Sequence, residues 1–253
     1  MSNKFYIYGR KPIQAAFKAE SNISKIFILF GTKGEEIDSI FSYARKNNIP
    51  LTTYDKGKFQ NLLISAGLEK ENHQGVIALR EIGMSLPIQQ LVDEAYYKSE
   101  KPVLVLLDEI QDPHNLGSIA RSAESAGCAG LILPDSKSSP VTPVAFKTSA
   151  GALEYLPYST VKSISNTVKY LKDNGFWVIG TSSEAEKVYT DNIYDVPIVL
   201  VIGNEGKGIR SYLQKECDIM VKIPTYGRTE SLNASVSAGI ILFEIMRQKN
   251  ISN

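Results

Sequence analysis

The sequence predicts an α/β protein made of two units, a small α/β unit followed by a larger one built on a parallel sheet. Short apolar segments alternate with segments of helical periodicity along most of the chain. The run V-L-V-L-L after Pro102 is continuously apolar, as is typical of a strand buried on both faces of a parallel sheet. A polar passage that contains glycine and proline, at 81–87, separates the two units.

The first unit is expected over residues 1–80, with strands and helices in alternation. The segment I-S-K-I-F-I-L-F at 23–30 predicts a strand, and Ile37, Ile40, Phe41 and Ala44 have the spacing of an amphipathic helix. The expected helices are 12–19, 35–47 and 59–66, and the expected strands are 23–30, 50–54 and 75–79.

A linker with a weak helix at 88–97 is expected at 81–98, and the second unit at 99–253. Strand–helix alternation in the second unit predicts a parallel sheet with helices on both faces. The expected strands are 103–108, 130–133, 176–180, 197–202 and 219–223, and the expected helices are 116–126, 161–174, 210–214 and 232–247.

The composition is that of a soluble globular protein, with 43% hydrophobic and 22% charged residues. No apolar run approaches the roughly 18 residues of a membrane span, and the N-terminus lacks the apolar core of a signal peptide. Cys128 and Cys217 stand alone, and the only histidines are His73 and His114, so neither a disulfide scaffold nor a Cys/His zinc cluster is expected. We expect a cytoplasmic protein with no membrane and no metal.

The charge is distributed unevenly, although the formal net charge is only +1. Residues 1–80 contain twelve Lys/Arg and seven Asp/Glu, a net charge of +5, and the remainder contains sixteen and twenty, a net charge of −4. A basic first unit suggests that this part meets a polyanion. The alternative is a solvated lysine-rich surface.

Ligands of open α/β sheets bind beyond the carboxyl ends of the strands, and three loops of the second unit lie there. The first is D-E-I-Q-D-P-H-N-L-G-S-I-A-R at 108–121. Asn115 is a plausible helix N-cap, and Arg121 stands among small residues that leave it room to reach a phosphate or carboxylate. The alternative for Arg121 is a surface salt bridge with Glu124.

The second loop is G-N-E-G-K-G at 203–208. Its three glycines let the backbone face a ligand directly. The spacing matches neither G-x-G-x-x-G nor G-x-x-x-x-G-K-[ST], so neither a dinucleotide nor a phosphate loop follows from it. Glu205 suits a ligand amine, a hydroxyl or a partner arginine.

The third loop, I-P-T-Y-G-R-T-E-S-L-N-A-S-V-S-A-G-I at 223–240, runs from an apolar segment into a helix. Ser231 and Asn233 lie at the junction, where backbone N–H groups and small polar side chains converge on a ligand, although both residues are also ordinary helix caps. Tyr226 and Arg228 could stack on a base or grip phosphate, or simply pack within the loop.

A Ser-His-Asp hydrolase is disfavoured, because no G-x-S-x-G elbow is present and only two histidines are available as a base. We interpret His73 and His114 as turn residues or as polar residues that face RNA.

Together, D-P-H-N-L-G-S-I-A-R-S-A, I-G-N-E-G-K-G-I and the third loop resemble the three motifs of the SpoU-type RNA ribose 2′-O-methyltransferases. That family belongs to the SPOUT, or trefoil-knot, superfamily, and the resemblance covers nearly all of the second unit. The first unit, through Y-G-R-K-P-I-Q-A-A-F and N-H-Q-G-V-I-A, is similar to the ribosomal-protein-like RNA-binding domain often fused ahead of it. Among the subfamilies, the chain looks most like the bacterial large-subunit rRNA guanosine 2′-O-methyltransferase.

The resemblance implies a knotted C-terminal domain, although true knots are nearly absent from proteins. It also implies that S-adenosylmethionine binds among the knot loops of a homodimer whose active site lies at the subunit interface. The positions implied for the cofactor are Gly203, Ile223, Leu232 and Thr181. The positions implied for catalysis or for placing the substrate are Arg121, Asn115, Glu205, Ser231 and Asn233.

The implied reaction is methyl transfer to a ribose 2′-hydroxyl of structured RNA, on a guanosine of 23S rRNA. Two alternatives stay open. One is the same reaction on tRNA or on an antibiotic-binding rRNA site. The other is a non-catalytic RNA-binding factor in ribosome assembly. Against it argue four intact motif residues, Asn115, Arg121, Glu205 and Asn233.

Overall fold

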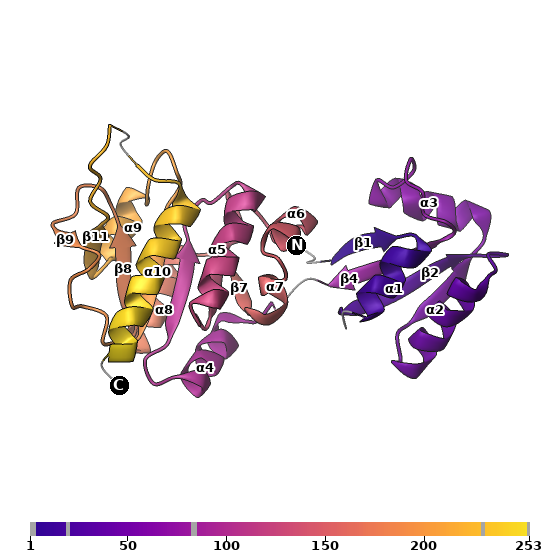
Figure 1. The fold of residues 1–253 in the computed structure, drawn as a ribbon, viewed down its shortest axis with the longest axis horizontal. Helices are drawn as coiled ribbons and strands as arrows, with labels where there is room; N and C mark the ends of the chain where they lie inside the picture. Colours follow the sequence, from indigo (N-terminus) through magenta and orange to yellow (C-terminus); the bar gives the residue numbers. More distant parts are fainter. Residues whose placement is uncertain (1–3, 19–20, 82–84, 229–230, 252–253) are drawn as a thin grey trace. The chain divides into compact units, whose positions relative to one another are not determined.

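The chain, in a computed structural model that describes residues 4–18, 21–81, 85–228 and 231–251, divides into two compact units. The smaller comprises residues 2–82 and the larger residues 83–253. Figure 1 shows the elements of each unit, which we describe separately.

The smaller unit is a four-stranded sheet between helices. Strands β1 (Lys4–Tyr8), β2 (Ile23–Leu29), β3 (Leu51–Tyr54) and β4 (Val76–Glu81) follow the order β1-β4-β2-β3, with β4 antiparallel to both of its neighbours. Helices α1 (Arg10–Lys18) and α2 (Glu35–Lys46) share one apolar cluster with the sheet, and α3 (Lys56–Ala66) shares the other. Strand β1 was not predicted, because K-F-Y-I-Y is too short to give a clear pattern.

The larger unit contains a seven-stranded sheet in which every pairing is parallel, as predicted. The strand order is β7-β6-β5-β10-β8-β11-β9. The strands are β5 (Val103–Leu107), β6 (Gly130–Pro134), β7 (Tyr158–Val161), β8 (Trp177–Thr181), β9 (Lys187–Val188), β10 (Ile198–Ile202) and β11 (Ile219–Lys222). The central strands β5 and β10 are buried along their whole length, which explains their continuously apolar sequences.

Helices cover both faces of this sheet. The helices α4 (Ile88–Lys98), α8 (Ile164–Asp173) and α9 (Ser211–Glu216) share a buried cluster with alternate residues of the central strands. Two others, α5 (Pro113–Ser125) and α10 (Ala234–Ile251), pack against each other, and short helices α6 (Pro143–Thr148) and α7 (Ala152–Tyr155) pack beside α5 (Figure 1).

The expected linker at 81–98 includes α4, which buries Leu91, Val92 and Ala95 in the core of the larger unit. Elsewhere in the larger unit, several elements differ from the predicted ones. The helix expected from Val161 begins only at Ile164, because Ser163 caps it, and the residues before it form β7. Helices α6 and α7 are too short to show a periodic pattern, so the sequence did not indicate them.

Parallel pairing places the carboxyl ends of the adjacent strands β5, β10, β8 and β11 on one edge of the sheet. The segments that follow these strands are therefore neighbours, although they come from distant parts of the sequence. All three loops singled out in the sequence are among them.

Helix α10 is fastened at its far end by two buried polar residues. Lys249 Nζ donates to the carbonyl oxygens of Lys101 (3.0 Å) and Val196 (2.7 Å), just before β5 and β10 begin. Gln248 Nε2 donates to the carbonyls of Thr190 and Asp191. The helix thus extends from the carboxyl edge of the sheet, where it starts, to the amino edge.

Among the described residues, no helix is both long and apolar enough to cross a membrane.

The anchor at Lys249 predicts a pH-dependent stability. Burial lowers the pKa of Lys249 to about 8, because the ammonium loses its hydration. The ordinary pKa of a lysine side chain is 10.5. Between pH 8 and pH 10.5, Lys249 therefore holds its proton in the unfolded chain but not in the folded one, so its contribution to the free energy of unfolding rises with pH. Urea unfolding should show wild type gaining stability relative to Lys249→Met over this range, by at most about 3 kcal/mol. The exposed Lys98, changed to Met, is the control, and a difference between wild type and Lys249→Met that is constant with pH would contradict the prediction.

Candidate active site

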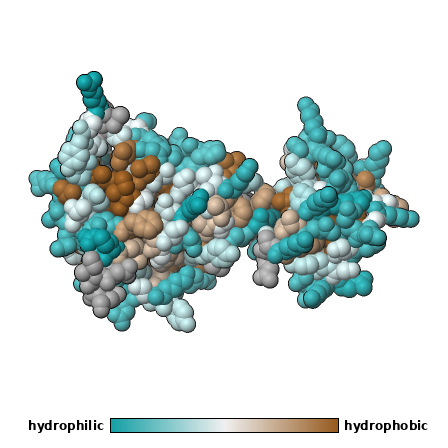
Figure 2. Space-filling model, in the orientation of Figure 1, coloured by the Kyte–Doolittle hydropathy of each residue, from teal (hydrophilic) through white to brown (hydrophobic). Residues whose placement is uncertain are grey.

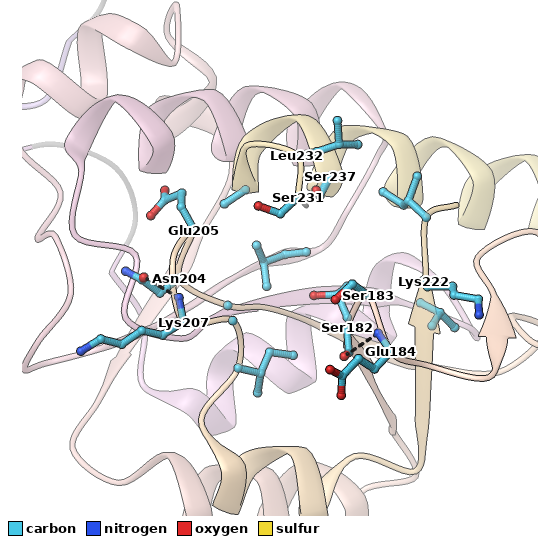
Figure 3. A pocket seen from close by; sticks show the side chains of 18 of the residues that line it. Ser182, Ser183, Glu184, Asn204, Glu205, Lys207, Lys222, Ser231, Leu232 and Ser237 are labelled. Carbon is cyan, nitrogen blue, oxygen red and sulfur yellow. Dashed lines mark hydrogen bonds between the residues drawn. The ribbon is translucent and has the colours of Figure 1, made fainter. Parts of the chain in front are cut away.

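The larger unit has a pocket of about 410 Å³ at the carboxyl edge of the sheet. Most of its lining comes from residues 181–184, beginning at the end of β8, residues 202–209, beginning at the end of β10, the end of β11 with its following loop, and the residues before and within the start of α10, and Gln214 of α9 completes it. Figure 3 shows Glu205, Ser231 and Ser182 among the side chains around this space. The lining mixes apolar side chains with charged and hydroxyl groups.

The residues expected at a cofactor all border this pocket. They are Gly203, Ile223, Leu232 and Thr181. Two of the residues expected to act in catalysis, Glu205 and Ser231, also line it. Six of the candidates named from the sequence therefore border one pocket, and they come from the second loop, the third loop and the end of β8.

Two further side chains, those of Asn115 and Asn233, form a polar chain that starts at Glu205. Asn115 Nδ2 donates to Glu205 Oε1 in a short contact, and Asn233 Nδ2 donates to Asn115 Oδ1 at 3.0 Å. These partners lie 90 and 118 positions apart in the sequence. One carboxylate and two amides thus join the loop after β10, the start of α5 and the start of α10.

Asn115 is not the N-cap of α5, contrary to the prediction. Asp112 caps the helix by accepting the His114 N–H at 2.8 Å, and Pro113 occupies the first turn, where its missing N–H costs nothing. The sequence reasoning took Asp112-Pro113 for a turn and began the helix too late. Because Asp112 supplies the cap, the Asn115 side chain is free to bond Glu205 and Asn233.

Asn233 combines the two roles that the sequence left open. Its Oδ1 accepts the Ser235 N–H (2.9 Å) and the Val236 N–H (3.4 Å), which caps α10. Its Nδ2 points the other way, to Asn115. The cap therefore fixes the orientation of the amide group that joins the polar chain.

Arg121 lies on α5 with an exposed side chain and is not among the residues that line the pocket. Within the described part of the chain it has no hydrogen bond or ion pair, so the salt bridge with Glu124, the alternative considered for Arg121, is not formed. Tyr226, in the third loop, is 96% exposed. Residues 229–230 of that loop lie outside the described residues.

The two histidines have local partners. His73 Nδ1 accepts the Gly75 N–H at 3.0 Å, within a turn of the smaller unit. His114 Nδ1 lies 3.2 Å from the Thr148 hydroxyl. The contact of His73 agrees with its interpretation as a turn residue, whereas His114 lies in the first turn of α5.

Sequence reasoning missed several residues that line the pocket. Ser182, Ser183 and Glu184 follow Thr181 directly, and their position after a strand at the binding edge was an available signal. Lys207 lies within the glycine loop, and Lys222 ends β11. Nothing in the sequence indicated Gln214 or Ser237, which reach the pocket only through the packing of α9 and α10.

Neither cysteine is suited to thiolate chemistry. Burial raises the pKa of both Cys128 and Cys217 to about 12, so each stays a neutral thiol near pH 7. No group of three or more His, Cys, Asp or Glu side chains, in the part of the chain that the structure describes, could hold a metal ion. The site offers instead a carboxylate, amides, hydroxyls and a glycine-rich backbone beside a pocket.

Comparison with known families gives two matches that together span most of the chain. The SpoU rRNA methylase family matches residues 102–243. A domain described as RNA 2′-O ribose methyltransferase substrate binding matches residues 6–81.

Curated relatives resemble this chain in sequence over nearly its whole length and over nearly their own. A Bacillus subtilis (strain 168) protein, YacO, whose name places it in the TrmH family of tRNA/rRNA methyltransferases, is 31% identical over 245 residues, covering 97% of this chain and 96% of its own. A Staphylococcus aureus (strain MSSA476) protein of the same family name is 35% identical, with 96% of each chain covered.

Solved structures share the fold. An AdoMet-bound rRNA methyltransferase from Sinorhizobium meliloti superposes with a TM-score of 0.71 at 24% identity, covering 97% of this chain and 87% of that one. The SpoU methyltransferase AviRb from Streptomyces viridochromogenes, in complex with AdoMet, gives 0.68 at 24% identity, with 99% and 92% covered. These likenesses confirm the predicted fold class, an α/β parallel-sheet domain preceded by a small α/β domain.

The glycine loop predicts a sharp difference between two of its glycines. A Cβ at Gly203 would lie 2.3 Å from the Gly208 carbonyl carbon and 2.4 Å from the Ile209 nitrogen, whereas a Cβ at Gly206 would lie 3.7 Å from its nearest neighbour. Gly203→Ala should therefore destabilise the protein by about 1–3 kcal/mol, the usual cost of overpacking. Gly206→Ala should change stability by less than about 0.5 kcal/mol. Thermal unfolding of the two variants checks this, and equal melting temperatures would contradict it.

Proposed function

Because the chain belongs to the SpoU rRNA methylase family, we propose that it transfers a methyl group from S-adenosylmethionine to a ribose 2′-hydroxyl, on a guanosine of 23S rRNA. One observation carries most of this proposal. The pocket at the carboxyl edge of the sheet adjoins the polar chain of Glu205, Asn115 and Asn233. A donor site and a set of groups that can hold a hydroxyl thus lie side by side.

The pocket's own residues fit S-adenosylmethionine. Apolar side chains, among them Ile202, Ile209 and Leu232, offer a surface for the adenine ring. Glu205 and Lys207 bring both signs of charge, which suits a molecule that carries a sulfonium, an ammonium and a carboxylate. Gly203 has no side chain, so the backbone of Gly208 and Ile209 packs closely against it and keeps this loop compact at the edge of the pocket.

Cofactor contacts are assigned to Gly203, Ile223, Leu232 and Thr181. The first three would act mainly through backbone atoms of the loops that border the pocket. The Thr181 hydroxyl donates to the Val201 carbonyl at 3.4 Å, so it joins β8 to β10 beneath the pocket.

S-adenosylmethionine, when bound, supplies a methyl group that its sulfonium charge already activates. The protein's task is then to place the 2′-hydroxyl and to help it lose its proton. Asn115, Ser231 and Asn233 orient the ribose, because they are neutral groups that can donate and accept hydrogen bonds and lie in or beside the loops that border the pocket. Glu205 holds the Asn115 amide in one orientation.

Arg121 is assigned to the substrate phosphate and to the negative charge that develops on the 2′-oxygen. A guanidinium keeps its proton above about pH 12, so it is a poor general base, and a neighbouring group or water takes the proton. The exposed Arg121 does not line the pocket of its own chain. In a homodimer with the site at the interface, it would serve the pocket of the second copy.

A homodimer is supported by the exposed apolar face of α10. Val236 and Phe243, seven positions apart and hence on one side of the helix, are 48% and 54% exposed. Figure 2 shows brown, hydrophobic atoms gathered over this helix. A second copy of the chain is the occupant that the proposal assigns to this surface.

The smaller unit, over residues 1–80, is assigned to RNA binding, residues 81–98 to the connection, and residues 99–253 to methyl transfer. The substrate-binding match at 6–81 and the net charge of +5 support the first assignment. The names of the relatives mention both tRNA and rRNA, so tRNA is the second candidate substrate. The family to which the chain belongs consists of methylases, which favours an RNA-modifying enzyme of the cytoplasm over a non-catalytic assembly factor.

The proposed reaction predicts where methyl label will appear. Incubation with labelled S-adenosylmethionine and total rRNA or tRNA, followed by mapping of 2′-O-methylation, should place label on a guanosine of 23S rRNA. Arg121→Ala should lower this rate by about 10²-fold or more, on the scale of losing one electrostatic stabiliser. Lys169→Ala, an exposed cation on α8, should leave the rate unchanged. If label appears only in tRNA, then tRNA is the substrate and the 23S rRNA assignment is wrong. If no RNA is labelled, the protein is better explained as a non-catalytic assembly factor.

The proposed dimer predicts the effect of a charge on α10. Phe243→Asp should convert a dimer to a monomer in sedimentation velocity and abolish methylation, because a carboxylate cannot be buried unpaired at the interface. Tyr97→Asp is the control, since Tyr97 is 93% exposed on α4. If Phe243→Asp sediments like the wild type, this face is not the dimer interface.

A further inference from the structure

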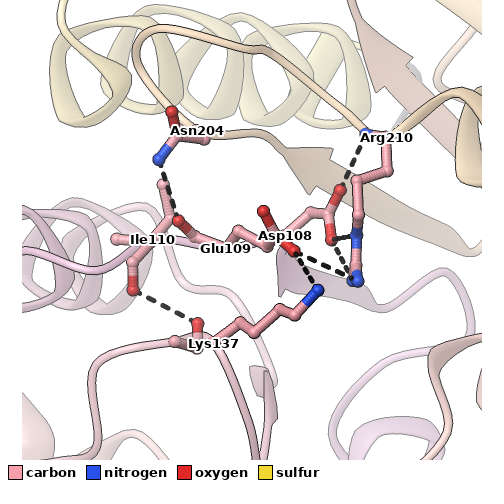
Figure 4. A network of polar contacts seen from close by, with 7 residues as sticks. Asp108, Glu109, Ile110, Lys137, Asn204 and Arg210 are labelled. Atoms are coloured by element: carbon pink, nitrogen blue, oxygen red, sulfur yellow. Dashed lines mark hydrogen bonds and ion pairs between the residues drawn. The ribbon is translucent and has the colours of Figure 1, made fainter.

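An ion pair between the buried Asp108 and the partly exposed Arg210 lies just outside the pocket, and the proposed reaction does not use it directly. Asp108, the first residue after β5, is fully buried. Arg210 donates to its carboxylate three times, from Nε (2.8 Å) and Nη2 (2.5 Å) to Oδ1 and from the backbone N–H (2.9 Å) to Oδ2. Figure 4 shows these contacts.

The next residue, Glu109, makes a second set of contacts with the same loop. Its backbone is left-handed, with φ of 57°, a conformation that costs a non-glycine residue about 1 kcal/mol or more. Its carbonyl oxygen accepts Asn204 Nδ2 at 3.1 Å, and its carboxylate lies 3.3 Å from Arg210 Nη1. Lys137 Nζ approaches the same carboxylate at 3.9 Å.

These contacts hold the segment 204–210 at both of its ends. Asn204 begins the segment and Arg210 ends it, and both bind the two residues that follow β5. Between them the turn is closed by hydrogen bonds from the N–H groups of Gly206 (3.0 Å) and Lys207 (3.3 Å) to Asn204 Oδ1. We call Asp108, Glu109, Asn204 and Arg210 the loop bracket.

We propose that the loop bracket positions the glycine loop for the cofactor and for Glu205, with Arg210 as its principal positioning residue. Glu205 follows Asn204 directly, so the anchor that fixes Asn204 also fixes the start of the polar chain to Asn115 and Asn233. This inference rests on the proposed function, which assigns the pocket to S-adenosylmethionine.

Stability alone is a weak explanation for this ion pair. Burying the Asp108 carboxylate costs desolvation energy that its attraction to the partly exposed Arg210 offsets, so such a pair seldom stabilises a fold more than apolar residues would. The planar guanidinium of Arg210 contacts the carboxylates of Asp108 and Glu109 at once, so the pair fixes the position of Arg210 relative to the residues that follow β5. A displacement of about 1 Å at a reacting site can lower a rate by about 10²-fold.

The test uses the full chain with Arg210→Gln and Arg210→Lys. In the cofactor-free protein, Arg210→Gln should speed amide hydrogen exchange at 206–210. In calorimetric titrations it should raise the Kd for S-adenosylmethionine at least tenfold, and it should lower kcat for RNA methylation by about 10²-fold. The Kd for RNA should stay within twofold. Arg210→Lys should give intermediate values, because lysine can compensate Asp108 but cannot bond both carboxylates.

Lys172→Met is the matched control. Lys172 pairs with Asp218 at 2.8 Å, and its side chain is 31% exposed, the same as that of Arg210. It should leave the exchange at 206–210 and both Kd values unchanged. A merely structural role for Arg210 would lower the fraction of binding-competent protein but leave the Kd for S-adenosylmethionine as it is.

Folded Arg210→Gln with wild-type exchange, cofactor affinity and kcat would overturn the inference. If that variant does not fold, Arg210→Lys decides, and wild-type values for it would overturn the inference as well. If the unaltered chain binds no S-adenosylmethionine, the pocket assignment fails, and exchange at 206–210 still shows whether the bracket orders the loop.

Discussion

The site depends on one constraint, the parallel alignment of β5, β10, β8 and β11 as neighbours in a single sheet. Because these strands run in the same direction, their carboxyl ends meet at one edge, and the segments after them share a small volume. The pocket, the polar chain and the loop bracket all lie in those segments. Any topology that reversed one of the four strands would move its loop to the opposite edge.

At that edge of the sheet, two polar side chains each stabilise their own loop and also bind a neighbouring one. Asn233 caps α10 and orients Asn115, and Asn204 closes the turn of the glycine loop while it binds Glu109. Residues that look like ordinary caps in the sequence are therefore the ones that connect the loops. The structural and the functional interpretation of such a residue are compatible, because one side-chain amide has both a donor and an acceptor.

The sequence predicted the larger unit well where the pattern was long and apolar. Strands β5 and β10 and helix α10 were expected nearly as they occur, because burial on both faces or along one helix leaves a clear signal. The first turn of α5 was mistaken, since Asp112-Pro113 is as typical of a turn as of a helix start. Candidate residues could be named by motif, but the bond between Asn115 and Glu205 could not, because it joins positions 90 residues apart. The ion pair of Asp108 and Arg210 left no sequence signal at all, since neither position differs from an ordinary charged loop residue.

The place of β10 between β5 and β8 has a consequence for how the protein is made. Strand β5 precedes α5, β6, β7 and β8 in the sequence, yet its partner at the centre of the sheet is β10. During synthesis, the pairings of β10 with β5 and β8 therefore cannot form until β10 has emerged from the ribosome. Strand pairings between distant segments form slowly, because closing the long loop between them costs conformational entropy before any stabilising contact is made. The pocket also needs the start of α10, so a nascent chain can form its binding site only after that helix has been synthesised. Exposed apolar edges of β5 and β8 are, until then, the part of this protein most in need of protection from aggregation.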